Sequence, residues 1–204
     1  MKFSLQHICA FGLVACLGLL SACQTAPVPP EVARNLASIR NEVEKGRTAT
    51  IETTARLRSL RDAKPNDLKV MYSAYDASVK SLESKALGVG LVMDFSQDRS
   101  DQYFGKWEKD IAQLAEDDTR SRAADRRAEA QASYRDIKSR VADLRVNFRA
   151  FMATLKDIHK MVGADTTPAG VKAAQPTIDA VLEREKLVLK DIDALIAAIN
   201  KVQP

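Results

Sequence analysis

The sequence predicts an all-α protein, an elongated antiparallel four-helix bundle or coiled coil with a projecting hairpin made by its second and third helices. Hydrophobic residues make up 46% of the 204 residues but aromatic ones only 5%, a composition typical of long helices. Apolar residues recur in alternating steps of four and three along four segments, which is the heptad pattern of packed helices. Short breaks separate the segments, and short connections make neighbouring helices antiparallel.

The first helix is expected over residues 31–62. Its apolar stripe keeps the heptad spacing throughout, but Gly46, Thr50 and Thr53 make the middle of the stripe weak. The helix is expected to stop before Pro65, because proline is tolerated in the first turn of a helix and not in its interior.

The second helix begins near Leu68, and its heptad frame continues to Leu114. Gly88, Gly90 and the polar stretch 94–102 weaken its middle. The pattern therefore allows one helix with a flexible middle or two helices with a short break, and the unbroken frame favours one helix.

The third helix follows an acidic turn and ends at Gly163, and its stripe over residues 130–162 has no polar exception. The fourth helix runs to about Val202, and Pro176 is expected to kink or restart it. Glu185 is the one exception on the apolar stripe of this helix.

The helix lengths predict the overall shape. At 1.5 Å per residue the first and fourth helices are about 45–50 Å long, the second up to about 75 Å and the third about 65 Å. The second and third helices should therefore project by roughly 20 Å, with the tip of the hairpin near Asp117. In an up-down-up-down bundle this tip lies at the end where the first helix begins and the fourth ends.

Residues 1–22 are expected to be a lipoprotein signal peptide. The charge-free stretch from Ile8 to Leu20 is shorter than the roughly 20 residues that span a bilayer. It leads into Leu-Ser-Ala-Cys, which resembles the lipobox of bacterial lipoproteins, so Cys23 is the expected site of lipidation, including palmitate. The alternatives are an ordinary cleaved signal, or a membrane anchor in which the cysteine occurs by chance.

Three parts of the chain follow from this interpretation: the signal peptide, a lipidated cysteine with a proline-rich tether over residues 23–30, and a helical bundle domain over residues 31–204. Gln24 follows the cysteine, and resemblance to Gram-negative lipoproteins then favours the outer membrane, on its periplasmic face. The net charge of +4 would suit nucleic acid in a cytosolic protein, but export makes nucleic acid an unexpected partner.

The sequence offers no constellation for catalysis. Once the signal peptide is removed, His159 is the one remaining histidine, whereas a zinc site or a di-iron bundle needs several ligands in a set spacing. The carboxylates of residues 116–118 lie on a turn, where helix capping and solubility explain them. We therefore expect no enzyme, no metal site and no cofactor other than the covalent lipid on Cys23.

Two clusters of residues could carry binding, and both lie in the projecting hairpin. The first is the aromatic patch of Tyr103, Phe104 and Trp107. Tyr103 and Trp107 lie on the heptad stripe and are expected to pack in the core, although the hairpin could leave part of Trp107 exposed as a contact anchor. The second cluster is basic, with acidic residues interleaved, so it predicts a solvated face or, alternatively, a patch for an anion or a partner. The basic cluster comprises Arg120, Arg122, Arg126 and Arg127. Asp118, at the tip of the hairpin, is a further candidate for binding a partner.

Residues 68–202 resemble a family of uncharacterised bacterial helical lipoproteins that contain a domain of unknown function. The resemblance rests on the Phe-Gly-Lys-Trp-Glu-Lys-Asp-Ile segment at residues 104–111, the acidic turn, the arginine-rich start of the third helix, Tyr134, and Phe151 followed by residues 155–158. The chain departs from the family pattern at residues 87–100 and 163–176. The resemblance implies a helical fold and export, and it implies no activity, substrate or site.

We therefore expect a membrane-anchored periplasmic lipoprotein that acts as a structural scaffold or adaptor. Its expected partners are the membrane, through the lipid anchor, and an envelope protein or cell-wall polymer. The alternative is a lipid- or small-ligand-binding helical bundle, in which wide apolar helix faces would enclose a cavity. A homo-oligomer is also possible.

Overall fold

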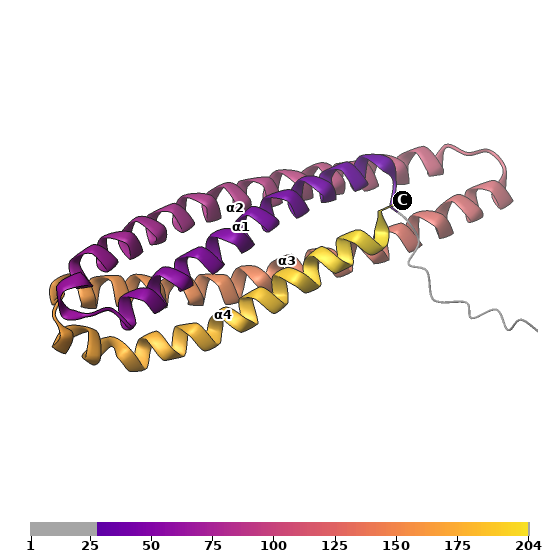
Figure 1. The fold of residues 1–204 in the computed structure, drawn as a ribbon. Helices are drawn as coiled ribbons and strands as arrows, with labels where there is room; N and C mark the ends of the chain where they lie inside the picture. The colour runs from indigo at the N-terminus through magenta and orange to yellow at the C-terminus, as the bar shows by residue number, and fades with distance from the viewer. Residues whose placement is uncertain (1–27, 204) are drawn as a thin grey trace, which may run out of the picture.

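The computed structural model describes residues 28–203, and it confirms an all-α fold of four long antiparallel helices (Figure 1). A single turn of 3-10 helix, η1, joins the first two helices, and the described residues contain no strand. The predicted signal peptide and Cys23 lie outside the described residues. The helices are α1 Pro30–Arg61, α2 Leu68–Ala112, α3 Asp117–Ala164 and α4 Pro168–Val202, with η1 at Pro65–Asp67.

The four helices surround one apolar core, and each of them packs on two neighbouring helices. Helix α1 packs on both α2 and α4, and α3 packs on the same two helices. The heptad stripes supply the core, with Leu36 of α1, Leu82 of α2, Phe151 of α3 and Ile192 of α4 all buried. Each helix thus buries the face that its apolar spacing predicts, except for the part of α2 beyond Ser100.

The projecting hairpin is confirmed: α2 and α3 extend beyond the start of α1 and the end of α4 (Figure 1). Val202, at the end of α4, lies in the same groove as Ala132 and Ser133, so about the first 15 residues of α3 project, a length of roughly 20 Å. The backbone N–H of Val28 donates to the carbonyl of Val202 over 3.1 Å. The chain therefore enters the bundle at the end from which the hairpin projects.

The heptad pattern predicts the wrong buried face for the part of α2 beyond Ser100. The heptad stripe placed Tyr103 and Trp107 in the core, whereas Phe104 is buried and these two side chains are half-buried beside it. A straight α-helix has 3.6 residues per turn, so its buried face drifts about 20° per heptad away from a strict seven-residue repeat. Two successive steps of four, from Ser96 through Ser100 to Phe104, correct this drift.

Helices α2 and α4 are both unbroken. Helix α2 runs through residues 88–102 without interruption, as the continuous frame predicted. Helix α4 contains Pro176 in its interior, so the predicted restart does not occur. Pro176 lies on the exposed face. Among the described residues, no helix combines the length and apolar character that crossing a membrane requires.

Candidate partner-binding site

An aromatic cluster fills the projecting hairpin. The ring of Trp107 stacks on that of Phe104 with 6.2 Å between centroids, and Tyr103 meets Trp107 edge-on at 6.1 Å. Tyr134 of α3 lies 5.4 Å from Phe104, so the cluster joins the two helices of the hairpin. Phe104 and Tyr134 are buried, whereas Tyr103 and Trp107 keep part of their surface in contact with solvent.

The phenol of Tyr134 is held in its neutral form. Its hydroxyl donates to the backbone carbonyl of Gln97 over 3.2 Å, and burial, reinforced by the charge of Asp101, raises the pKa of Tyr134 above its ordinary value near 10. Lys138 lies over the face of the same ring, 5.7 Å from its centroid. The hydrogen bond to Gln97 therefore ties α3 to α2 on this side of the hairpin, and Lys138 covers the ring from within α3.

The predicted basic cluster divides into two parts. Arg127 reaches across to α2, where its Nε donates to the carbonyl of Phe104 over 3.1 Å and its Nη2 pairs with Glu108 over 2.9 Å. Arg120 forms an ion pair with Asp117 one turn away, and Arg122 lies 3.5 Å from the hydroxyl of Thr119. Arg127 thus holds the hairpin together, and the other two act within the first turns of α3.

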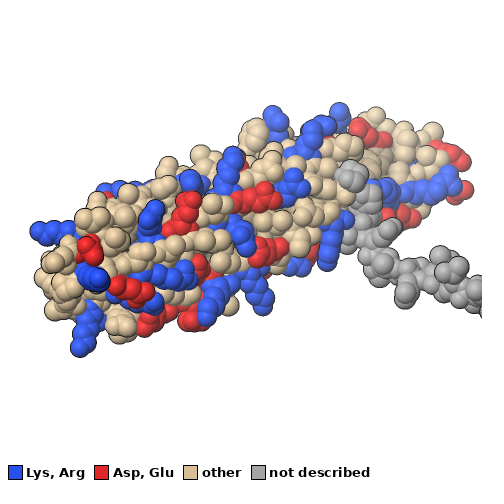
Figure 2. Space-filling view, in the orientation of Figure 1, with Lys and Arg blue, Asp and Glu red and all other residues tan. Residues whose placement is uncertain are grey.

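The tip of the hairpin is acidic. Glu116, Asp117 and Asp118 are all exposed, and Asp118 stands in the first turn of α3, where the helix dipole favours a negative charge. Arg126, also from the predicted basic cluster, is half-buried further along α3. Figure 2 shows acidic residues at the end of the hairpin and basic residues next to them. The hairpin therefore combines a partly exposed aromatic cluster with a charged tip.

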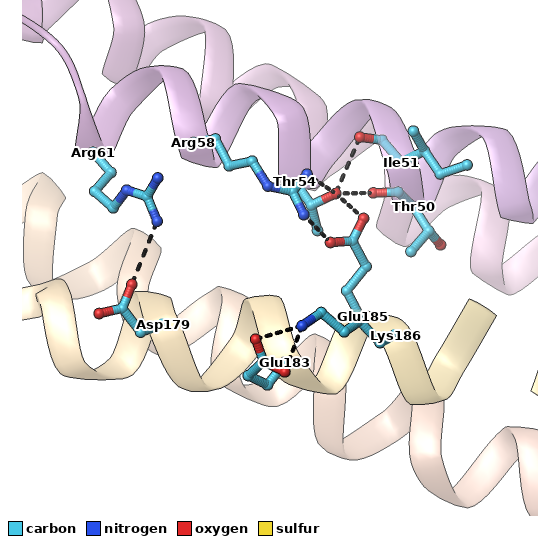
Figure 3. A network of polar contacts seen from close by, with 9 residues as sticks. All are labelled: Thr50, Ile51, Thr54, Arg58, Arg61, Asp179, Glu183, Glu185 and Lys186. Carbon is cyan, nitrogen blue, oxygen red and sulfur yellow. Dashed lines mark hydrogen bonds and ion pairs between the residues drawn. The ribbon is translucent and has the colours of Figure 1, made fainter. Parts of the chain in front are cut away.

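A second polar site lies between α1 and α4, and only one of its members could be recognised in the sequence. Glu185, the exception on the apolar stripe of α4, is buried (4% exposed), and Thr54 Oγ1 lies 2.5 Å from its Oε1 (Figure 3). Arg58 forms an ion pair with the other carboxylate oxygen, and its guanidinium is partly exposed. All three polar groups of this network have partners, so it ties α1 to α4.

An apolar cavity of about 90 Å³ lies near the middle of the bundle. Ligand pockets usually measure about 300–1,000 Å³, so this cavity is too small to hold a lipid chain. It is bounded on different helices by Gly46, Val89, Phe148 and Ile192.

Comparison of the chain with protein-family models, curated proteins and solved structures gives no match. The resemblance to helical lipoproteins therefore stays a prediction that rests on the residues quoted for it. Within the part of the chain that the structure describes, no group of three or more histidine, cysteine or acidic side chains is arranged to hold a metal ion.

Proposed function

We propose that this protein is a lipoprotein anchored by Cys23 in the outer membrane, where its helical bundle serves as a periplasmic scaffold or adaptor. Its hairpin would contact another envelope protein or a cell-wall polymer. The observation that carries the proposal is the hairpin itself, which extends past the four-helix base and ends in exposed charged residues (Figure 1).

The exposed part of Trp107 supports a protein partner for the hairpin. Tryptophan contributes a large apolar area and a polar N–H, and it is enriched among the residues that dominate binding energy at protein interfaces. Here the indole is backed by the buried ring of Phe104, and Arg127 fixes the backbone carbonyl of that residue. The partly exposed aromatic face is thus held rigidly, which lowers the entropy lost on binding.

The position of the tether supports a partner that lies close to the anchoring membrane. Val28 is held at the base of the hairpin, and Cys23 precedes it by five positions. Five residues span at most about 17 Å, which is close to the roughly 20 Å by which the hairpin projects. An anchored molecule would therefore present its tip at the membrane surface, which favours an envelope protein in that membrane over a distant polymer.

The ligand-binding alternative has weaker support. A bundle that carries lipid needs an apolar cavity on the scale of a hydrocarbon chain, and the cavity near Gly46 has only about 90 Å³. Native mass spectrometry of the gently extracted protein separates the two proposals, because a co-purifying ligand is expected only for the alternative.

A photo-crosslinking amino acid at Asp118 tests the adaptor proposal in intact cells. Asn66 is the matched control, because it is also an exposed polar residue where two long helices meet but lies at the opposite end of the bundle. We expect a discrete protein adduct from position 118 and none of the same mass from position 66. If the protein is abundant in the membrane fraction and position 118 gives no adduct, the hairpin tip is not a protein-binding site.

A further inference from the structure

Three glycines lie at one level near the middle of the bundle. Gly46 belongs to α1, and Gly88 and Gly90 belong to α2. A Cβ atom added at Gly46 would lie 3.5 Å from a methyl carbon of Val89, so the two helices face each other at these glycines. The other glycines of the described residues lie toward the two ends of the bundle.

No contact within the described part of the chain requires glycine at these three positions. A Cβ atom added at Gly88 or Gly90 would meet no atom within 4 Å, and the contact at Gly46 is at an ordinary van der Waals distance. Gly163 differs, because its Cβ would lie 2.3 Å from the hydroxyl oxygen of Tyr72. A glycine in the interior of a helix destabilises that helix relative to alanine, since glycine loses more conformational freedom on folding. The three glycines therefore soften α1 and α2 at the same level.

The apolar cavity of about 90 Å³ lies at the same level. It is bounded by Gly46 and Gly90 of α1 and α2, and by Phe148 and Ile192 of α3 and α4. Atoms that line a cavity lack contact partners on one side, so the packing here is weaker than in a filled core. Met93 also borders the cavity, and its unbranched side chain can adapt to a changed space. The helices can therefore shift here without forcing side chains to overlap.

Firm contacts between α2 and α3 lie on both sides of this level. Toward the η1 end, the buried hydroxyl of Tyr75 donates to a backbone carbonyl of α3 over 2.8 Å. Toward the tip, the hydroxyl of Tyr134 donates to a backbone carbonyl of α2 over 3.2 Å. At the level of the glycines, Nη2 of Arg145 pairs with the exposed carboxylate of Asp94 over 2.6 Å and lies 3.4 Å from the carbonyl oxygen of Gly90. Ion pairs on the surface contribute little to stability, so this contact holds the helices less firmly than the two tyrosines do.

We propose that this level of the bundle, defined by Gly46, Gly88 and Gly90, is a hinge at which the molecule bends. The part toward η1 and the part toward the hairpin tip would then tilt relative to each other as two rigid bodies. Sharp bends in helices occur where residues such as glycine weaken them, and a few hinge residues absorb the backbone change between rigid parts. The hinge lets the part of the bundle far from the tip swing, whatever molecule the tip contacts.

The distribution of glycines sets the side on which the bundle bends. The glycines of α3 and α4, Gly163 and Gly170, lie near the end at which these two helices are joined. Both helices therefore run past the hinge without a glycine. Helices α1 and α2 lie together along one side of the molecule (Figure 1). We expect these two helices to yield while α3 and α4 keep their course, so the bundle bends toward or away from the side formed by α1 and α2.

Hydrogen exchange of the backbone amides in the full chain tests the local softness. In the parent protein we expect the amides of residues 86–94 to exchange about tenfold faster than those of residues 72–82, which also lie in α2. Gly90→Ala should slow exchange at residues 86–94 by about two- to fivefold, because alanine stabilises a helix interior. Gly105→Ala is the matched control, since its Cβ also meets no atom within 4 Å but lies in the projecting hairpin, and it should leave residues 86–94 unchanged. Equal protection of the two segments in the parent protein would overturn the hinge.

Residual dipolar couplings of the same amides test whether the softness produces bending. In a rigid bundle one alignment tensor fits every helix, whereas a mobile hinge gives the two parts tensors of different magnitude. We expect this difference between residues 68–82 and residues 98–134 in the parent protein, and its loss in the triple variant Gly46→Ala, Gly88→Ala, Gly90→Ala. A single tensor for the parent protein would overturn the hinge. A difference that the triple variant retains would also overturn it, because the motion would then not arise at the glycines.

Discussion

At the scale of single residues, Glu185 shows what the sequence can and cannot predict. Its position on the apolar stripe of α4 identifies it as a buried carboxylate, and a buried charge needs a partner. Its partners Thr54 and Arg58 lie more than 120 positions earlier in the chain, and several arginines on α1 could have served. Only the packing of α1 against α4 decides which of them reaches the carboxylate (Figure 3).

We expect Arg58→Met to lower the free energy of unfolding by about 2 kcal/mol, because it leaves Glu185 buried with the hydroxyl of Thr54 as its remaining partner. The full effect of breaking a buried pair is about 3–5 kcal/mol, and the partial exposure of Arg58 reduces it. The double variant Arg58→Met, Glu185→Met should recover most of the loss. Urea unfolding measures both, and equal stability of Arg58→Met and the parent protein would contradict the expectation.

Tyr75 makes stability depend on alkaline pH. It is fully buried, its hydroxyl donates to the carbonyl of Leu155 over 2.8 Å, and burial raises its pKa above the ordinary value near 10. Above pH 10 the unfolded chain releases the phenolic proton and the folded chain keeps it. The contribution of Tyr75 to the free energy of unfolding is therefore constant below pH 10, and it falls by about 1.4 kcal/mol per pH unit above pH 10.

We expect Tyr75→Phe to be about 1 kcal/mol less stable than the parent protein at pH 8, where the lost hydrogen bond dominates. At pH 11 the difference should vanish or change sign, because phenylalanine does not ionise. Denaturant unfolding at the two pH values checks this, and Tyr134 contributes equally to both proteins and cancels. A difference that stays the same at both pH values would show that Tyr75 does not keep its proton in the folded state.

At the scale of the helices, the apolar spacing predicts which face of each helix is buried, and it is accurate except beyond Ser100 in α2. The heptad frame placed Trp107 on the core face and left Phe104 without a position, whereas the structure exchanges their roles. Both are apolar, so the sequence alone does not show where the drift of a straight helix is corrected. This shift of the buried face places Trp107, the expected contact anchor, at the partly exposed edge of the core instead of inside it.

Glycines within the helices differ in what surrounds them, and this predicts opposite effects of the same substitution. Gly90→Ala should stabilise the protein by about 0.5–1 kcal/mol, because an added Cβ at Gly90 meets nothing within 4 Å and alanine favours the helix. Gly170→Ala should destabilise it by more than about 1 kcal/mol, since its Cβ would lie 2.0 Å from the backbone oxygen of Asp165. Thermal unfolding of the two variants tests the pair, and a destabilised Gly90→Ala would contradict the expectation.

At the scale of the whole molecule, the lengths of the helices and of their connections were enough to predict the bundle, the projecting hairpin and the end at which the chain enters it. Three exposed apolar residues on α2, Leu87, Leu91 and Phe95, were not predicted, because they lie outside the core stripe, and the apolar spacing does not reveal what an outward-facing leucine contacts.

The proposed anchoring of the whole molecule depends on one residue, Cys23. The described helices contain no membrane-spanning segment, so the proposed attachment rests on acyl chains, each buried CH₂ of which contributes about 0.8 kcal/mol. We expect Cys23→Ala to move the protein from the membrane fraction to the soluble periplasmic fraction, and Cys16→Ala, the matched control within the predicted signal peptide, to leave it in the membrane. Fractionation followed by immunoblotting measures both. If Cys23→Ala remains in the membrane fraction with an unchanged mass, the chain is held there by its uncleaved signal segment and Cys23 is not the anchor.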